Sequence, residues 1–220
     1  MLHQGSDVLA KVRAALDRRA PLGAPPTPPV IDEPIARLVH SDFGLPELFA
    51  RMAESNQMDP ELLYVDQLGE RIAAYLGQHG VSRVALPSSS SLLEQTGVPT
   101  ALRGAGLDVI DWDQTTLDQL YDIDAAVTDV YAAVAETGSL VVRASPHHGR
   151  GLPLVPPIHV AVLEPKNFIP DLVDVFQKMA ADGVTSSTSI ITGPSRTADI
   201  EMSLVVGVHG PTIVKTFILQ

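Results

Sequence analysis

Short apolar segments rich in β-branched residues alternate with segments of helical periodicity, and this alternation most constrains the fold of the chain. Residues 158–163 (IHVAVL) are too short and too β-branched for a helix and predict a strand. Residues 167–182 carry apolar side chains at helical spacing up to Gly183, which predicts a helix. Further strands are expected at residues 83–86, 107–110, 139–143, 189–192 and 212–219, and further helices over residues 61–75 and from the serine run 88–91. Strands separated by helices predict an α/β fold, with a mostly parallel sheet and helices on both faces.

The first 35 residues have a different character from the rest. Ser6 can cap a helix that carries Val8, Val12 and Leu16 on one stripe. Six prolines follow between Pro21 and Pro34, and each fixes φ and removes a backbone donor. We therefore expect an N-terminal helix on a Pro-rich linker over residues 1–35 and an α/β domain over residues 36–220. A helix this short is marginal alone, so it should dock on its own domain or on a neighbour.

The absence of cysteine excludes several kinds of site from this chain. It can hold no thiol nucleophile, no Cys-ligated zinc and no iron–sulfur cluster with cysteine ligands. If the protein takes part in electron transfer, the redox metal must belong to a partner. The seven histidines lack the spacing that puts two ligands on one helix face, so no metal or cofactor is predicted. The adjacent His147 and His148 lie between proline and glycine, which predicts a solvated loop, whereas His159 inside a strand predicts a core histidine.

The charge of the chain bears on its partners and location. A net charge of −11 argues against nucleic acid, because each phosphate contact needs a cation. No apolar run reaches the ~18 residues of a membrane span, and the start lacks a signal-peptide core, so we expect a cytoplasmic protein without membrane insertion. Between Asp108 and Asp129 there are seven aspartates and no lysine or arginine. This segment is either a solvated face around short strands or a docking face for a basic partner protein.

A first candidate site is the segment 135–139 (AETGS), just before the expected strand 139–143. Glu136 followed by Thr137, Gly138 and Ser139 can offer a base or nucleophile beside exposed backbone donors. The same four residues also fit a hairpin turn, with the glycine at positive φ and the hydroxyls closing hydrogen bonds.

A second candidate site follows the expected strand 189–192, at what should be a strand-to-helix junction. Gly193, Ser195, Arg196 and Thr197 are the parts of an anion cradle, in which amides and hydroxyls donate and the guanidinium clamps two oxygens. The same loop could simply be a capped helix start, with Asp199 balancing the arginine.

A third candidate is the segment 207–211 (GVHGP). Its glycines let the backbone approach a ligand, while His209 points across it. The alternative is a structural histidine bonded to a carbonyl. The combined candidate site has Glu136, Asp199 and His209 as catalytic residues and Thr137, Gly138, Ser139, Gly193, Ser195, Arg196, Thr197, Glu201 and Gly210 as ligand-binding residues.

Four motifs, AETGSLVV, LPLVPPIHVAV, GPSRTADIE and GVHGP, occur in the order in which the LUD-domain family of lactate-utilisation proteins carries them. Over about residues 36–220 the chain resembles that family, and within it the small, cysteine-free subunit. The resemblance implies a fold like that of ribose-phosphate isomerase, glucosamine-phosphate deaminase and the CoA transferases. It implies a role in oxidising L-lactate to pyruvate within a three-protein assembly, whose other subunits are similar to iron–sulfur oxidoreductase components. It assigns no agreed role to the motif residues, which include His159.

Three hypotheses follow from these observations. The leading one is a non-catalytic or co-catalytic subunit of a lactate-oxidising complex. In it, loop 192–201 holds a carboxylate or phosphate-bearing ligand, Glu136 or His209 manages a proton, and the partners are the iron–sulfur oxidoreductase subunits. The second is a free-standing enzyme of the isomerase and CoA-transferase-like fold that acts on a sugar phosphate or acyl-CoA, with Glu136 as base or nucleophile. The third is an assembly or regulatory protein that works through its N-terminal helix and acidic segment. The site itself requires that the segments at Glu136 and Ser195 face each other with free amides.

Overall fold

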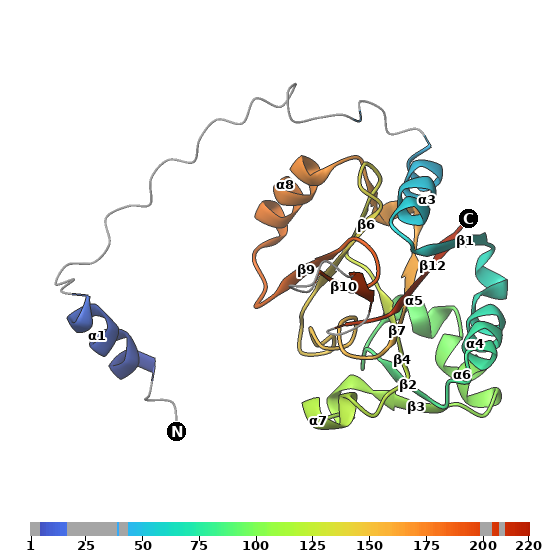
Figure 1. Cartoon of the computed structure of the whole chain (residues 1–220), viewed down its shortest axis with the longest axis horizontal. Coiled ribbons are helices and arrows are strands. Elements are labelled where there is room, and N and C mark those ends of the chain that lie inside the picture. Colours follow the sequence, from blue (N-terminus) through green and yellow to red (C-terminus); the bar gives the residue numbers. More distant parts are fainter. Residues whose placement is uncertain (1–4, 17–38, 40–43, 199–203, 207–209) are drawn as a thin grey trace. The chain divides into compact units, whose positions relative to one another are not determined.

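The chain divides into two units, Met1–Asp32 and Glu33–Gln220. The computed structural model describes residues 5–16, 39, 44–198, 204–206 and 210–220 (Figure 1). In the first unit, helix α1 spans Gly5–Ala15, which confirms a helix near the N-terminus. It begins one residue before Ser6, so this serine lies in the first turn and does not precede the helix as predicted. The expected proline-rich linker between residues 21 and 34 lies outside the described residues.

The second unit is built on a six-stranded parallel sheet in the order β1-β12-β7-β4-β2-β3. Every neighbouring pair in this sheet is parallel. Its strands are β1 (Asp59–Leu63), β2 (Arg83–Leu86), β3 (Asp108–Asp111), β4 (Ala125–Asp129), β7 (Ile158–Leu163) and β12 (Ile213–Leu219). All six residues of β7 are buried, as expected for a parallel strand covered on both faces. The α/β fold with a mostly parallel sheet is therefore confirmed.

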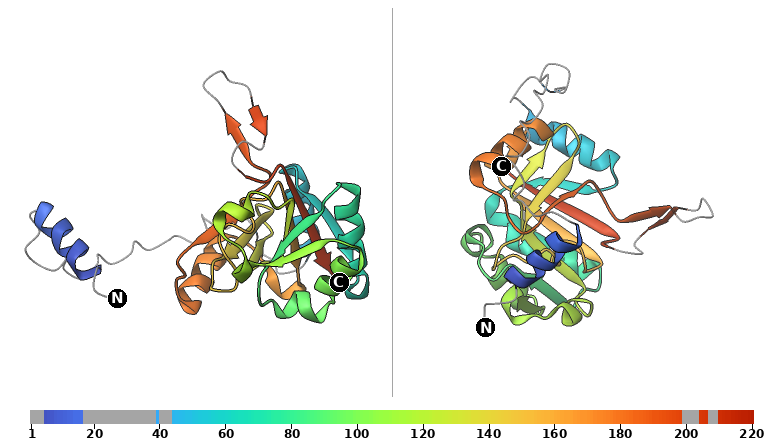
Figure 2. Two further views of the ribbon diagram at one scale, coloured as in Figure 1. Left: turned by 90° about the horizontal axis from the view of Figure 1, so that it is seen from below. Right: turned by 90° about the vertical axis from the view of Figure 1, so that its left-hand side faces the viewer.

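A second sheet of four strands has the order β8-β5-β6-β9. Strands β5 (Ala132–Val134) and β6 (Ser139–Arg143) form an antiparallel hairpin, β9 (Thr188–Ile191) pairs antiparallel with β6, and β8 (Phe168–Ile169) pairs parallel with β5. Strands β10 (Arg196–Ala198) and β11 (Leu204–Val206) pair antiparallel with each other and extend away from both sheets (Figure 2).

Helices and the second sheet cover opposite faces of the large sheet. Helices α4 (Leu68–Gln78), α5 (Ser91–Gln95) and α6 (Val98–Gly104) pack on one face, and α3 (Leu45–Ser55) packs with the second sheet on the other (Figure 1). Residues of β7 alternate between the two cores, because successive side chains of a strand point to opposite faces. Helix α8 (Leu172–Asp182) packs through Val175 on the outer face of the second sheet. The short helix α7 (Leu117–Leu120) and 3₁₀ turns at Val65–Gln67, Trp112–Gln114 and Pro165–Asn167 complete the fold.

Several local predictions hold and several are wrong. Ser90 caps α5 through its side chain, as the serine run predicted. The predicted helix over residues 61–75 is wrong at its start, because β1 ends at Leu63 and α4 begins at Leu68. The predicted helix over residues 167–182 likewise begins with β8, and α8 starts after its cap Asp171. In both places, the apolar residues of a short strand continue the spacing of the following helix, so periodicity alone does not separate them.

One cationic side chain is buried in the large sheet. Lys215 of β12 is 2% exposed, and its Nζ lies 3.0 Å from Asp59 Oδ2 and 2.9 Å from Glu61 Oε2 on β1. The same Nζ lies over the rings of Tyr75 and Phe217. Because a buried charge is costly unless it is paired, this cluster ties edge strand β1 to the sheet. No helix among the described residues has the length and apolar character needed to cross a membrane.

Candidate functional site

Strands β2 and β4 lie side by side, and their connections leave in opposite directions across the sheet. The chain passes from β2 to β3 on one side, whereas after β4 it reaches β7 on the other side. In open parallel sheets, ligands bind at the carboxyl ends of two such strands. Strand β2 ends at Leu86 before the serines 88–90, and β4 ends at Asp129. The expected location of a ligand is therefore the space above these two strand ends.

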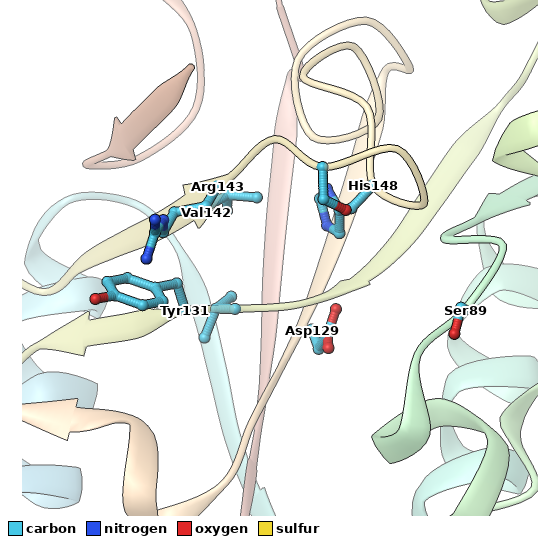
Figure 3. A pocket seen from close by; sticks show the side chains of 8 residues that line it. Ser89, Asp129, Tyr131, Val142, Arg143 and His148 are labelled. Carbon is cyan, nitrogen blue, oxygen red and sulfur yellow. The ribbon is translucent and has the colours of Figure 1, made fainter. Parts of the chain in front are cut away.

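A pocket of about 220 Å³ lies in this space. The residues that line it include Ser89, Asp129, Tyr131, Val142, Arg143 and His148. In Figure 3, the imidazole of His148 reaches down towards Asp129, the stacked Arg143 and Tyr131 lie to one side, and Ser89 lies on the other. The volume is below the ~300 Å³ at which pockets begin to hold drug-sized molecules. The pocket suits a small polar ligand.

Buried polar atoms without a hydrogen-bond partner gather at this pocket. Within the described part of the chain they include Arg143 Nε and both ring nitrogens of His148, which is only 8% exposed. Nδ1 of the fully buried His159, which interacts electrostatically with His148, is also without a partner, while its Nε2 lies 2.9 Å from Thr128 Oγ1. An unsatisfied buried polar group is costly in a folded protein, and a bound ligand or an ordered water commonly satisfies such a group. These atoms are the strongest indication that the pocket binds something.

The two buried histidines are held in the neutral form. Burial lowers the pKa of His148, and the nearby charge of Asp129, together with smaller effects of the backbone at His148 and Gly149, opposes this only in part. Burial also lowers the pKa of His159 to about 3, with a smaller contribution from His148. A neutral imidazole offers one donor and one acceptor, so His148 can accept a hydrogen bond from a ligand hydroxyl.

The loop of residues 144–157 places His148 in the pocket. The N–H of Ser145 donates to the carbonyl of His148 (2.8 Å), which closes a tight turn. Gly149 then lies against the indole ring of Trp112, where a Cβ atom would collide with the ring carbons. Leu152 is fully buried in a cluster with residues of α7 and the sheet. The prediction that His147 and His148 form a solvated loop is therefore wrong for His148, because long-range packing turns it inward, while His147 is exposed.

Arg143 is held at the pocket by the C-terminus of α8. Its guanidinium lies 4.5 Å from the centre of the Tyr131 ring, and its Nη2 donates to the carbonyl of Gly183 (2.6 Å). The Tyr131 hydroxyl donates to Asp182 Oδ2 (2.7 Å), which also pairs with Lys178. These contacts fix the position of the cation and leave its Nε for a ligand.

The structure brings parts of all three segments predicted from sequence together, at a different place from this pocket. Ser139 Oγ lies 2.8 Å from Thr192 Oγ1, which joins the segment at Glu136 to the segment that contains Ser195. Both segments also contact Asn56, which ends α3: its Nδ2 donates to the Thr137 carbonyl, and Gly193 lies against its carbonyl. Ser139 and Arg143 are the two ends of β6, so the predicted site and the pocket are roughly 13 Å apart along the strand.

Several backbone amides of the two predicted segments, at Glu136 and at Ser195, already have partners. The N–H groups of Glu136, Gly138 and Ser195 donate to the carbonyls of Pro170, Val134 and Pro211 at 2.8–3.0 Å. Gly138 has φ +64° in the β5–β6 hairpin, and Thr137 Oγ1 lies 2.7 Å from Ser139 Oγ, as the alternative hairpin interpretation predicted. The strand-to-helix junction expected after residue 192 is wrong, because Arg196 and Thr197 begin strand β10.

The ligand-binding role of these residues stays a prediction. Glu136 keeps one feature of a proton-transfer group: burial, together with the charge of Asp171, raises its pKa. Gly210 packs against Ser195 at the base of the β10–β11 hairpin. The predicted residues Asp199, Glu201 and His209 lie outside the described residues. Within the described residues, no group of three or more metal-ligating side chains occurs.

Sequence reasoning missed the residues that form the pocket. The sequence places Asp129 in the acidic segment, with a solvated face and a docking face as the two interpretations, although it ends a buried strand whose residues 125–127 are apolar. A polar residue at the end of such a strand is the signal that could have revealed it. Arg143 similarly ends the predicted strand 139–143. No comparable signal marks His148, because its burial depends on contacts distant in sequence.

Comparison with known proteins gives consistent matches. A family model described as "LUD domain" matches residues 46–219. "Lactate utilization protein C" of Halalkalibacterium halodurans is 29% identical over 181 residues, which cover 78% of this chain and 77% of that protein. The protein of the same name from Bacillus licheniformis is 28% identical over 225 residues, covering 96% and 93%. That of Bacillus velezensis is 36% identical over 115 residues, and this match spans about half of each protein (48%).

A solved structure supports the fold. The crystal structure of a DUF162 family protein from Deinococcus radiodurans superposes with a TM-score of 0.63 at 22% identity, covering 82% of this chain and 99% of that one. At this level of identity the similarity establishes the architecture alone.

Proposed function

The chain belongs to the LUD-domain family, and on that premise we propose that it is a component of a lactate-utilisation system that binds a small carboxylate in the pocket between β2, β4 and β6. Relatives that align with most of its length carry the name lactate utilization protein C. The observation that carries the proposal is the group of unpartnered buried nitrogens on Arg143 and His148, at the strand ends where this type of sheet binds ligands.

The stoichiometry of lactate oxidation indicates what partners are needed. Conversion of L-lactate to pyruvate releases two electrons and two protons. With no cysteine, this chain cannot hold an iron–sulfur cluster with cysteine ligands. We therefore infer that the electrons pass to iron–sulfur oxidoreductase subunits of the same system, and that this chain contributes ligand binding.

The polarity of the pocket supports a 2-hydroxy or 2-oxo acid as the ligand. Arg143 supplies a cation for the carboxylate, and a charge-assisted hydrogen bond to it is stronger than a neutral one. Neutral His148 and the Asp129 carboxylate can both accept a hydrogen bond from a hydroxyl on the neighbouring carbon. The carboxylate of such an acid would accept from Arg143 Nε, and the single hydroxyl of a 2-hydroxy acid would donate to either His148 or Asp129.

A free-standing enzyme is the second candidate, and the raised pKa of Glu136 favours it. In that function Glu136 is the base or nucleophile for a sugar phosphate or acyl-CoA. Turnover of such a substrate by the isolated chain, lost in Glu136→Gln, would support this alternative. L-lactate binding that is unchanged in Glu136→Gln would instead support the pocket at Arg143.

Titration calorimetry of the purified full chain with L-lactate and pyruvate tests the main proposal. We expect Arg143→Gln to weaken binding by about tenfold or more, since a hydrogen bond to a charged group contributes about 1.5–3 kcal/mol. Arg150→Gln is the matched control, because Arg150 is exposed on the loop that carries His148 and does not line the pocket. His148→Gln is a second variant for the same test, because Arg143→Gln also loses the stacking on Tyr131 and could unfold for that reason.

Two results would contradict the proposal. One is a wild-type chain that binds neither acid, and the other is binding unaffected by both pocket variants. The role in the wider system is tested separately, by co-purification with the iron–sulfur subunits and by growth of a deletion strain on L-lactate. Failure to recover a complex together with normal growth would remove that role.

A further inference from the structure

We propose that Asp129 is a specificity-determining residue that restricts the pocket to acids with a single carboxylate, and this inference rests on the proposed function. Opposite charges lie on different sides of the pocket: Arg143 comes from the end of β6, and Asp129 from the end of β4 (Figure 3). A ligand that spans the pocket meets a cation at one end and an anion at the other.

The Asp129 carboxylate is available to a ligand. Among the described residues, no hydrogen bond or ion pair engages this side chain, and it interacts with His148 through its charge alone. Asp124, the last residue before the same strand, differs in this respect. Its Oδ2 accepts the N–H groups of Ser82 and Arg83 at 2.8 and 2.9 Å, so Asp124 has a structural task in joining β4 to β2. The two ends of β4 thus carry one structural and one unengaged carboxylate.

No second cation on the pocket wall offsets the charge of Asp129 among the described residues. Apart from Arg143, the polar side chains that line the pocket with it are the neutral His148 and the hydroxyls of Ser89, Ser145 and Tyr131. A hydroxyl or an uncharged methyl group is compatible with this environment, because a hydroxyl can donate to the carboxylate. A second carboxylate would lie beside a like charge in the half-buried pocket, which disfavours binding.

L-lactate and L-malate form a matched pair of probes for this inference. Both are 2-hydroxy acids of the same hand, and malate carries an additional carboxylate where lactate has a hydrogen on its methyl group. We expect titration calorimetry of the full wild-type chain to show at least about tenfold tighter binding of L-lactate than of L-malate. In Asp129→Asn, which keeps the shape and removes the charge, we expect this ratio to fall at least about tenfold through improved malate binding.

Asp113→Asn is the control, because Asp113 is exposed in the same acidic segment and does not line the pocket. It should leave the ratio unchanged. If the wild-type chain binds L-lactate through Arg143 but binds L-malate equally well, the role of Asp129 is refuted while the proposed function stands. If L-lactate does not bind at all, the proposed function itself fails. The wild-type ratio does not depend on a variant, so the inference is testable even if Asp129→Asn fails to fold.

Discussion

Acidification should destabilise the protein through His159, and the size of this effect can be worked out from the structure. His159 is fully buried in β7, and its pKa is lowered from 6.5 to about 3. In the unfolded chain it regains its ordinary pKa, so the unfolded state binds more protons as the pH falls below 6.5. Stability is therefore fully present above that pH and is lost progressively as the pH falls towards 3.

Linkage gives the magnitude. Between about pH 7.5 and about pH 5, preferential protonation of the unfolded state lowers the free energy of unfolding by about 2 kcal/mol from this one residue. The lowered pKa of His148 adds a loss of the same sign. His159→Gln keeps an amide nitrogen near Thr128 Oγ1 but cannot titrate. We expect this variant to lose about 2 kcal/mol less than the wild type over the same interval.

Urea unfolding followed by circular dichroism at the two pH values measures this difference. Each protein is compared with itself, so any cost of the substitution at neutral pH cancels. His147→Gln makes the same chemical change at the exposed neighbour of His148 and should behave as the wild type. If His159→Gln loses as much stability as the wild type, the reasoning that burial keeps His159 neutral is refuted.

Three further substitutions test the packing and the buried charge. Gly138→Ala should lower the free energy of unfolding by about 3 kcal/mol or more, because φ is +64° and the new Cβ would collide with the backbone of α3. Gly77→Ala, in α4, is the control and should be neutral or stabilising, because a Cβ there meets open space. Thermal melts of both variants measure the difference. Leu152→Ala should lower the free energy of unfolding, measured in urea, by about 2–5 kcal/mol through the cavity it creates. Leu154→Ala, at the more exposed neighbour, should have little effect. Equal effects of the two substitutions would contradict the burial of Leu152. Lys215→Met should lower the free energy of unfolding by about 3 kcal/mol at neutral pH, because it leaves the carboxylates of β1 without their cation. The loss should be smaller at acid pH, where these carboxylates become protonated. A loss of stability that does not change with pH would argue against the ion pairs.

The alternation of strand and helix patterns predicted most of the large sheet, because buried parallel strands have a strong compositional signal. Strands β2, β3, β7 and β12 of the large sheet, and β6 and β9 of the second sheet, fall within a residue or so of their expected positions. Strands β1 and β4 were missed for different reasons. The apolar residues of β1 continue the spacing of α4, and β4 consists largely of alanine within an aspartate-rich segment. Local sequence does not record which segments the tertiary structure will bury.

The pocket was beyond sequence reasoning because its parts come from four separate segments. Ser89, Asp129, Arg143 and His148 are brought together by the neighbouring positions of β2 and β4 and by the return of the loop after β6. Strand order is a long-range property, and a sequence pattern predicts that strands exist but not which ones are adjacent. Proximity of these residues became visible only with the order β7-β4-β2.

The motifs that revealed the family have a physical basis that does not require a ligand. A Cβ at Gly138 would collide with Ala53, one at Gly193 with the carbonyl of Asn56, and one at Gly210 would lie 3.0 Å from the Cβ of Ser195. All three glycines also have φ between +64° and +148°, which other residues rarely adopt. Close contacts and positive φ therefore account for these three glycines, so the motifs that contain them identify the architecture of the second sheet and the segments beside it. Chemistry at the β2 and β4 ends needs only side chains of suitable charge, which short patterns describe poorly. For this reason the family could be recognised from motifs that contain none of the charged side chains of the pocket and only Val142 of its lining.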